Sequence, residues 1–452
     1  MEQNQLEQIA QDLVGRAMRG GATAADVMVR EGDEFSAVIR MRHIESLKEA
    51  ASRTLGLRAF AGTRSASTYS QDFSDRSLEK LVDRTLEMAR ATSEDPASGL
   101  AEAARLGRYT GDLQIYFPDV VRLSTEERLD WARRAEQAAL EADPRIQNSE
   151  GASFEASSGT KAYANSIGFV GSYSSSYCGV SVTPVATNGH GSGMQRDYWY
   201  SVGRRVGALE SPEAVGRKAA ERALRKLGAR KVKTCQVPVV FDAEVARSLA
   251  GHLFEAVRGD AIYRSASFLA GKLHQSVAGE NITVLDDGLR PGGFGSRPFD
   301  DEGVPASTNT VIQKGVLQSY LLNSYTARKL NLQTTGNAAR GVAGPPGVGP
   351  KNFYLAPGTY SREEILRSVK SGLYVTELIG FGVNIITGDY SRGAAGTWIE
   401  NGELTFPVQE VTIAGNLPQM LHHVAMVGSD LEFRSALAAP TLLIEGLTVA
   451  GT

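Results

Sequence analysis

The chain has 452 residues, 42% of them hydrophobic and 22% charged, a balance typical of folded globular proteins and too apolar for a disordered chain. At roughly 150 residues per domain, this length predicts two or three domains. The 48 Lys and Arg against 51 Asp and Glu leave a formal net charge of −3, which excludes a strongly basic nucleic-acid-binding protein by composition. The 48 glycines, about 11% against a usual ~7%, favour many turns and strands over a helical bundle.

Neither the beginning of the chain nor its cysteine content indicates export. The first 20 residues contain acidic side chains and lack the apolar run of a secretory signal. Two cysteines, Cys178 and Cys235, are too few for a disulfide framework. No stretch approaches about 18 uninterrupted apolar residues, so no membrane-spanning helix is expected. We therefore expect a cytoplasmic protein.

The first half of the chain predicts strands followed by helices, twice over. A helix over 6–18 precedes a meander of short strands and a second helix over 77–90. A capping box, in which Ser124 is followed three residues later by Glu127, predicts the start of another helix. The strands expected around these helices include 26–30, 36–40, 54–60, 146–157, 161–165, 169–185 and 194–206. This separation of strands from helices predicts an α+β fold rather than a doubly wound parallel sheet.

The second half is richer in glycine and is expected to be dominated by strands. The segment 231–233 (KVK) marks a boundary, and a helix is expected over 243–257. We therefore expect an N-terminal α+β domain of antiparallel sheet and helices over 1–230, and a Gly-rich, strand-dominated C-terminal domain over 231–452. A division of the first domain into two strand–helix units near 95–120 stays open.

The residue patterns alone reveal no self-sufficient catalytic centre. No two of the six histidines lie four or five residues apart, the spacing that would place two imidazoles on one helix face for zinc. His422 and His423 are adjacent in an expected strand and would point to opposite faces. Two acidic clusters, at 286–287 and 300–302, stand beside Gly and Pro and are expected to be solvated turns. The sequence also lacks a Gly-x-Ser-x-Gly elbow and a Gly-Lys-Ser/Thr phosphate loop.

The C-terminal half carries a longer signature. It consists of 376–384 (TELIGFGVN), 387–396 (TGDYSRGAAG), 398–403 (WIENGE) and 407–417 (PVQEVTIAGNL). With these segments the chain resembles the TldD/PmbA family, and within it the PmbA (TldE) branch. The resemblance covers essentially the whole chain, and its specific motifs follow residue 237. It implies a cytosolic, two-part architecture whose C-terminal domain is equivalent to the family's metallopeptidase domain.

The resemblance also implies where a zinc site would fall. In the TldD branch, a helix of the C-terminal half carries His-Glu-x-x-x-His, and a Cys near the end completes the site. Anchoring on 259–260 (GD) places the His-Glu pair on Ala250 and Gly251, and the second His on Glu255. The Cys-bearing segment corresponds to about 435–439, which contains no Cys. We therefore expect no catalytic residue, metal ligand or cofactor in this chain, and expect zinc in a TldD-type partner.

The resemblance then predicts a non-catalytic PmbA/TldE-type subunit of a TldD/TldE zinc metallopeptidase complex that degrades or processes small or unfolded peptides. The expected partners are a TldD-type zinc peptidase subunit and a peptide, with a homodimer open for the isolated chain and no nucleic acid or membrane. The candidates for contacts in the peptide cleft are Asp389, Tyr390, Ser391 and Arg392, expected in a Gly-rich turn.

Two alternatives stay open. The first is a stand-alone homodimeric peptidase with an atypical site built from groups such as His252, Glu255, Asp286 and Asp287. The second is a non-enzymatic regulatory binding protein linked to DNA gyrase. The near-neutral charge gives the second no support through direct contact with nucleic acid.

Overall fold

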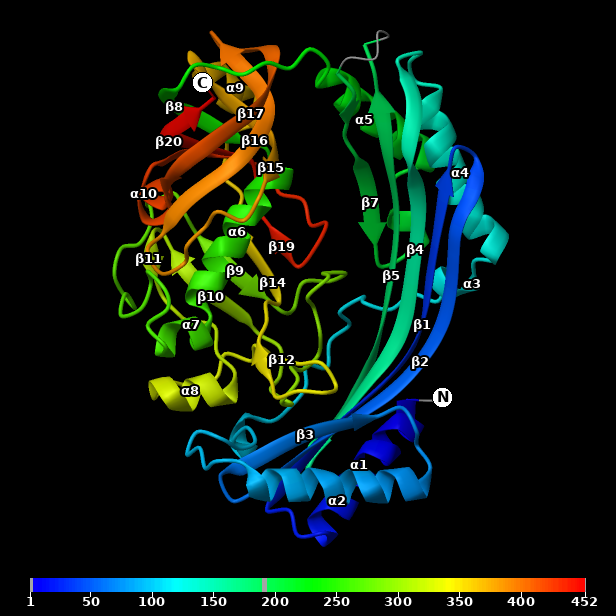
Figure 1. The fold of residues 1–452 in the computed structure, drawn as a ribbon. Coiled ribbons are helices and arrows are strands. Elements are labelled where there is room, and N and C mark those ends of the chain that lie inside the picture. The colour runs from blue at the N-terminus through cyan, green and yellow to red at the C-terminus, as the bar shows by residue number, and fades with distance from the viewer. Residues whose placement is uncertain (1–2, 189–192, 452) are drawn as a thin grey trace.

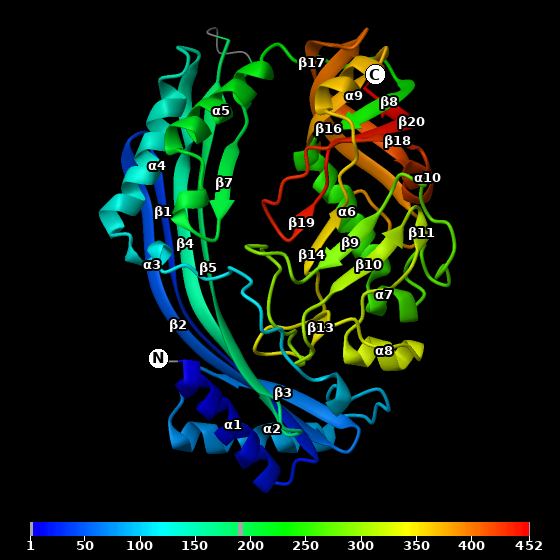
Figure 2. The same ribbon diagram turned by 180° about the vertical axis from the view of Figure 1, so that it is seen from behind.

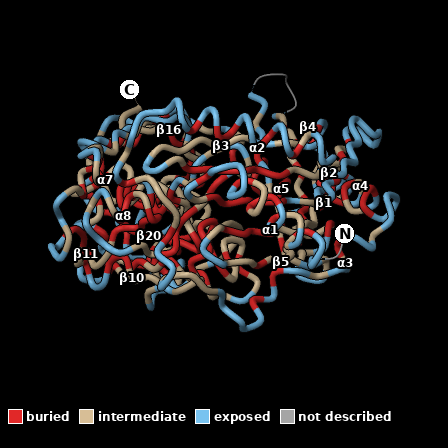
Figure 3. Tube along the Cα trace, turned by 90° about the horizontal axis from the view of Figure 1, so that it is seen from below, coloured by how far each residue is buried: buried red, intermediate tan, exposed pale blue. Residues whose placement is uncertain are grey.

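The computed structural model describes residues 3–188 and 193–451. A long curved sheet from the N-terminal half carries helices at both of its ends, and the C-terminal half lies beside the concave side of this sheet (Figures 1 and 2). Buried segments gather inside both halves (Figure 3). The α+β prediction is confirmed, because helices and mainly antiparallel strands occupy separate stretches of the chain. Among the described residues, no helix is long and apolar enough to cross a membrane.

The N-terminal half forms one seven-stranded sheet with the order β3-β2-β1-β4-β5-β6, in which β7 also pairs with β5. The pairings are antiparallel throughout. The strands are β1 (Ala24–Arg40), β2 (His43–Ala61), β3 (Arg64–Ser70), β4 (Ile146–Asn165), β5 (Val170–Ala186), β6 (Gln195–Arg196) and β7 (Trp199–Gly203). Four of them are 17 to 20 residues long, so the sheet is long in the direction of its strands.

Three of these strands are longer than the sequence predicts, and one of them, β2, begins at His43 although a strand is expected only over 54–60. The breaks expected at 31–35 and 158–160 are absent, and β1 and β4 each run through them. Gly32 of β1 pairs with Gly159 of β4. A Cβ added to Gly32 would lie 2.6 Å from the Ser158 carbonyl oxygen, and one added to Gly159 would lie 2.9 Å from the Glu31 carbonyl oxygen. These glycines therefore allow two backbones to approach within a sheet rather than forming turns.

Two pairs of helices cover the two ends of the long sheet (Figure 1). The helices are α1 (Gln3–Arg19), α2 (Asp75–Ala91), α3 (Asp119–Arg122), α4 (Thr125–Leu140) and α5 (Pro212–Arg225), with 3₁₀ turns at Ala103–Arg105 and Val206–Ala208. The apolar faces of α1 and α2 close one core against the sheet, and those of α4 and α5 close another. The capping box predicted at Ser124 and Glu127 is confirmed and starts α4.

The C-terminal half contains a six-stranded sheet with the order β17-β16-β15-β8-β20-β18, and an additional β17–β20 pairing closes five of its strands into a ring. A second sheet has the order β11-β10-β9-β14-β19. The strands of the first sheet are β8 (Cys235–Phe241), β15 (Ser371–Ile379), β16 (Asp389–Glu400), β17 (Glu403–Asn416), β18 (Val424–Val427) and β20 (Leu442–Ala450). Those of the second are β9 (Val284–Asp287), β10 (Thr308–Gln313), β11 (Val316–Leu317), β14 (Asn352–Leu355) and β19 (Leu437–Ala438). The short pair β12 (Ala338–Ala339) and β13 (Gly347–Val348) stands apart.

The helix α6 (Ala243–Val257) packs between these sheets and supplies much of the largest hydrophobic core. The shorter helices of this half are α7 (Gly259–Tyr263), α8 (Ser324–Leu330), α9 (Arg362–Ser368) and α10 (Leu417–His422). His422 ends α10 and His423 follows it, so the strand expected at this pair is wrong. Pro418 in the first turn favours this helix, because the first helical turn tolerates proline and a paired strand does not.

A buried ionic cluster joins the two halves. Asp26 Oδ2 of β1 accepts a hydrogen bond from Arg58 Nε of β2 at 2.9 Å. Asp26 Oδ1 lies 2.8 Å from Nη2 of Arg340, which belongs to the C-terminal half. All three side chains are nearly inaccessible to solvent. Beside them, Lys161 of β4 forms an ion pair with Asp301 of the C-terminal half. We call Asp26, Arg58 and Arg340 the junction cluster.

Candidate functional site

The helix α6 is fixed at its N-terminus by a carboxylate. Asp242 caps the helix by accepting from the Glu244 N–H at 3.0 Å, and its second oxygen accepts from the Tyr374 hydroxyl of β15. Burial and Asp242 raise the pKa of Tyr374. Leu253 and Phe254 then bury one face of the helix. The orientation of α6 against β15 and β16 is therefore set by both packing and hydrogen bonding.

The three positions of α6 expected to replace the zinc motif carry no ligand set. Ala250 is fully buried in the core. Gly251 faces Leu437 of β19, and a Cβ added to it would lie 3.5 Å from a Leu437 side-chain carbon. Glu255 is exposed and accepts from Arg258 Nη1 at 2.7 Å. Alanine and glycine have no donor atom for a metal, so the residues present do not fit a catalytic zinc, which needs three protein ligands.

A metal-binding group is also absent from the rest of the described residues. Over residues 3–188 and 193–451, no group of three or more His, Cys, Asp or Glu side chains is placed to hold a metal ion. His190 lies outside the described residues. The structure therefore does not gather His252, Glu255, Asp286 and Asp287, the set expected for an atypical site, into a metal-binding group.

The four cleft candidates lie at the start of β16, so their expected place in a turn is wrong. Strand alternation divides them between two faces. Tyr390 is 1% exposed and Arg392 is half-buried on the same face, whereas Asp389 and Ser391 are exposed on the other. Asp389 accepts from Thr387 Oγ1 at 2.6 Å, a contact local to its own loop. The structure thus brings Tyr390 and Arg392 together and separates them from Asp389 and Ser391.

His252 of α6 lies against this face of β16. Its ring meets the Tyr390 ring edge to face, with centroids 6.2 Å apart. Burial, together with the Arg392 charge, lowers the pKa of His252 to about 4. Burial also raises the pKa of Tyr390. We call His252, Tyr390 and Arg392 the α6–β16 polar group. Sequence reasoning named all three residues, but it assigned them to different hypotheses, because only the register of β16 against α6 brings them together.

Asp286 and all of 300–302 are buried and Asp287 is half-buried at the end of β9, so the solvated turns expected for the two acidic clusters are wrong. Asp286 is completely inaccessible, accepts from Asn337 Nδ2 at 2.6 Å and from the Lys351 N–H at 2.8 Å, and has a pKa that burial raises. Asp300 accepts three backbone N–H groups, and burial together with Glu302 raises its pKa to about 7. These carboxylates organise loops of the C-terminal half, since buried backbone donors need acceptors.

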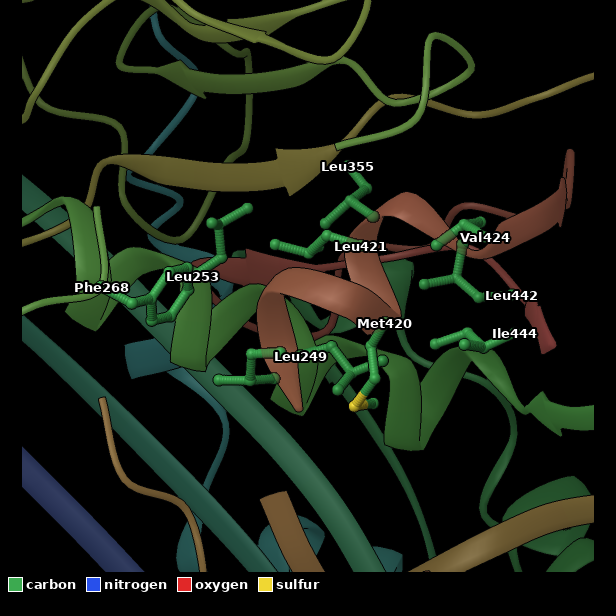
Figure 4. Close-up of a pocket in the computed structure, with 10 residues that line it drawn as sticks. Leu249, Leu253, Phe268, Leu355, Met420, Leu421, Val424, Leu442 and Ile444 are labelled. Atoms are coloured by element: carbon green, nitrogen blue, oxygen red, sulfur yellow. The ribbon is translucent and has the colours of Figure 1, made fainter. Parts of the chain in front are cut away.

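Two grooves lie where the halves meet. One, of about 480 Å³, is bordered by the first turn of α6, by Arg434 and by Leu437. The other, of about 460 Å³, is bordered by Asp95, Tyr263 and Tyr325 near α7 and α8. A third, internal gap of about 20 Å³ lies in the apolar core where α6, α10 and β20 converge (Figure 4). It has room for about one water-sized sphere and no polar lining, so it offers no ligand site, in contrast to the two outer grooves.

Comparison with known proteins extends this picture. Sequence models for the PmbA/TldA metallopeptidase match three segments: domain 1 at 25–89, the central domain at 118–227 and the C-terminal domain at 234–451. The metalloprotease PmbA of Escherichia coli O157:H7 is 39% identical over 433 residues, which cover 96% of this chain and 93% of that protein. A metalloprotease PmbA homologue of Haemophilus influenzae is 34% identical over 100% of this chain and 97% of its own.

Solved structures show the same fold. A putative modulator of DNA gyrase from Bacteroides thetaiotaomicron has a TM-score of 0.90 at 28% identity, covering 98% of both chains. TldE from Thermococcus kodakarensis has a TM-score of 0.85 at 20% identity, over 98% of this chain and 99% of that one. At that identity, the second likeness concerns the fold alone.

Proposed function

This chain is a member of the PmbA/TldD metallopeptidase family, and on that premise we propose that it is a non-catalytic, PmbA/TldE-type subunit of a cytoplasmic peptidase complex. The zinc site of the complex belongs to a TldD-type partner. Together the two chains degrade or process small or unfolded peptides. This chain contributes part of the peptide-binding surface.

The observation that carries the proposal is the chemistry of the zinc-motif positions. Ala250 and Gly251 have no side-chain donor, Glu255 is exposed and paired with Arg258, and 435–439 contains no Cys. Hydrolysis at zinc requires three protein ligands and a bound water whose pKa the metal lowers. A chain of this family without those ligands retains the fold and the grooves, which supports a binding role rather than a hydrolytic one.

The test is reconstitution of peptide cleavage from separated subunits. The full chain and a TldD-type subunit carrying His-Glu-x-x-x-His are purified separately and together, and cleavage of a short unstructured peptide is followed by mass spectrometry. We expect no cleavage and no stoichiometric zinc with this chain alone, and cleavage at least tenfold faster with both chains than with either. A partner lacking the first motif His is the matched control and should abolish cleavage.

Two results would overturn the proposal. One is full activity from this chain alone with one zinc per chain, which would favour a stand-alone peptidase. The other is the absence of any association or activation with a zinc-bearing partner, together with stable binding to DNA gyrase, which would favour a regulatory protein.

A further inference from the structure

Arg392 carries a positive charge that no carboxylate neutralises. Its guanidinium forms no ion pair with any of the described residues, and its Nε is buried without a hydrogen-bond partner among them. Arginine cannot lose its proton in a protein, so the charge persists in this half-buried position. The buried Arg58 and Arg340, by contrast, both face Asp26.

Two further polar groups flank this charge. The Tyr390 hydroxyl and His252 Nε2 are also buried and lack a partner among the described residues. After burial, the Arg392 charge is the other influence on the pKa of His252 and of Tyr390, and no carboxylate affects either pKa. Burial keeps the tyrosine protonated, so its hydroxyl remains a donor. A buried polar group without a hydrogen-bond partner is costly, and here the Tyr390 hydroxyl, His252 Nε2 and Arg392 Nε, from two separate elements, lack one at the same place.

Parts of the His252 and Arg392 side chains are exposed to solvent, although the three unpartnered atoms themselves are buried. The pairing of β15 with β16 ends at Ile379 and Gly393, so Arg392 is the first residue of β16 beyond the end of β15. Beyond that point the loop after β15 lies beside β16, and the Ser391 N–H donates a hydrogen bond to the Gly382 carbonyl oxygen at 2.7 Å. His252 and Arg392 remain partly exposed, whereas Tyr390 forms the buried base.

We propose that His252, Tyr390 and Arg392 form a binding site for a carboxylate of a peptide ligand, with the C-terminal α-carboxylate as its occupant. A carboxylate has two oxygens that accept several hydrogen bonds and a negative charge that neutralises arginine. The phenol O–H and the guanidinium N–H groups are donors, and the neutral imidazole adds a third when its proton is on Nε2; a carboxylate can accept from all of them. The identification of the ligand as a peptide rests on the proposed function. The preference of the site for an anion rests only on the residues that form it.

The experiment measures peptide binding to the full chain by calorimetry. The probes are Ala-Ala-Ala-Ala with a free C-terminus, the same peptide with a C-terminal amide, and Ala-Glu-Ala-Ala amide, whose only carboxylate is on a side chain. We expect amidation of the first peptide to weaken binding by roughly tenfold or more, the size of a charge-assisted hydrogen bond. The Arg392→Met variant should bind the acid and the amide within about twofold of each other, and Tyr390→Phe should reduce the difference several-fold.

Thr405→Ser is the control, since Thr405 is exposed beside the other end of β16, where it donates a hydrogen bond to the Trp398 carbonyl oxygen at 3.1 Å, and it should behave as the unaltered chain. An NMR titration with acetate provides a second readout, in which the His252 ring signals shift in the unaltered chain and not in Arg392→Met. Equal binding of acid and amide, or no measurable binding of the acid, overturns the proposal. Binding of the Glu-containing amide as tightly as the acid supports the carboxylate site but overturns the α-carboxylate as its occupant.

These outcomes are independent of subunit reconstitution. If the partner is activated but acid and amide bind alike, the carboxylate site fails and the proposed function stands. If the acid binds through Arg392 but no partner is activated, the carboxylate site stands and the proposed function fails.

Discussion

The junction cluster and the α6–β16 polar group both place arginine away from solvent, and they differ in what surrounds it. In the junction cluster, Asp26 lies between Arg58 and Arg340, so each arginine faces a negative charge. In the α6–β16 polar group, Arg392 faces a phenol and an imidazole, neither of which carries negative charge. The first arrangement is complete within the chain and holds the two halves together. The second is completed only by an anion from outside.

The largest test of this contrast removes the charge at the centre of the junction cluster. Asp26→Asn keeps the shape of the side chain but leaves Arg58 and Arg340 buried without a counter-charge. Breaking one partner of a buried ionic group costs about 3–5 kcal/mol, and we expect a loss of that size in the free energy of unfolding measured in urea. The two arginines hold the pKa of Asp26 below its usual range, so this stabilisation is present above the pKa of the unfolded chain and is lost as pH falls through the folded pKa.

Asp75→Asn is the control for this substitution. Asp75 also pairs with an arginine, Arg16 at 2.5 Å, but its side chain is 82% exposed. Surface ion pairs contribute roughly 0–1 kcal/mol, so its loss should be small. A loss below about 1 kcal/mol for Asp26→Asn would contradict the structural role given to the junction cluster.

The sequence predicted those parts of the fold that depend on local rules. The capping box at Ser124 starts a helix, because the capping residue and its partner Glu127 lie within one turn of each other. The apolar periodicity of 243–257 matches α6. Glycine was the less reliable signal. Gly32 and Gly159 fall in the gaps between the predicted strands, yet they lie within long strands. What they accommodate is a neighbouring strand, which the local sequence does not identify.

The candidate site was predictable only in part, for the same reason. The resemblance selected Ala250, Gly251 and Glu255, and the residue types alone exclude a zinc ligand set there. Which of the residues 389–392 face α6 depends on the pairing of β16 with β15 and β17, a long-range register that the sequence of β16 does not specify. The burial of Asp286 and Asp300 likewise depends on distant backbone donors, such as the N–H groups of Lys351 and Ala338.

A smaller effect on stability is expected from two tyrosines of one sheet, of which one has a hydrogen-bond acceptor and the other has none among the described residues. Tyr374 of β15 and Tyr390 of β16 are both buried, but the Tyr374 hydroxyl donates to Asp242 whereas the Tyr390 hydroxyl has no acceptor among the described residues. Hydrogen bonds to charged groups contribute about 1.5–3 kcal/mol, so Tyr374→Phe should lower the free energy of unfolding by that amount. Tyr390→Phe removes a buried hydroxyl that gains nothing within the chain. It should change stability by less than about 0.5 kcal/mol or increase it.

Urea unfolding of the two variants in one buffer measures this difference, and each serves as the control for the other because the substitution is identical. Equal losses for the two tyrosines would show that the Tyr390 hydroxyl is satisfied inside the folded chain. That result would contradict the difference proposed between Tyr374, whose hydroxyl has an acceptor in the chain, and Tyr390, whose hydroxyl has none among the described residues.

The smallest expected effect is a pH dependence centred on His252. Its pKa is lowered to about 4 in the folded chain, so between pH 6.5 and 4 the unfolded chain binds a proton that the folded chain does not. The unaltered chain should therefore lose stability over that interval relative to His252→Gln, by roughly 1 kcal/mol because solvent at the partly exposed ring screens the interaction. Urea unfolding at pH 7, 5.5 and 4.5 measures the difference, and Thr405→Ser should keep the unaltered slope. A bound carboxylate offsets the Arg392 charge and favours the protonated imidazole, so saturating Ala-Ala-Ala-Ala acid should flatten this slope while the amide leaves it unchanged. An unaltered slope with the acid peptide would show that the carboxylate does not reach His252.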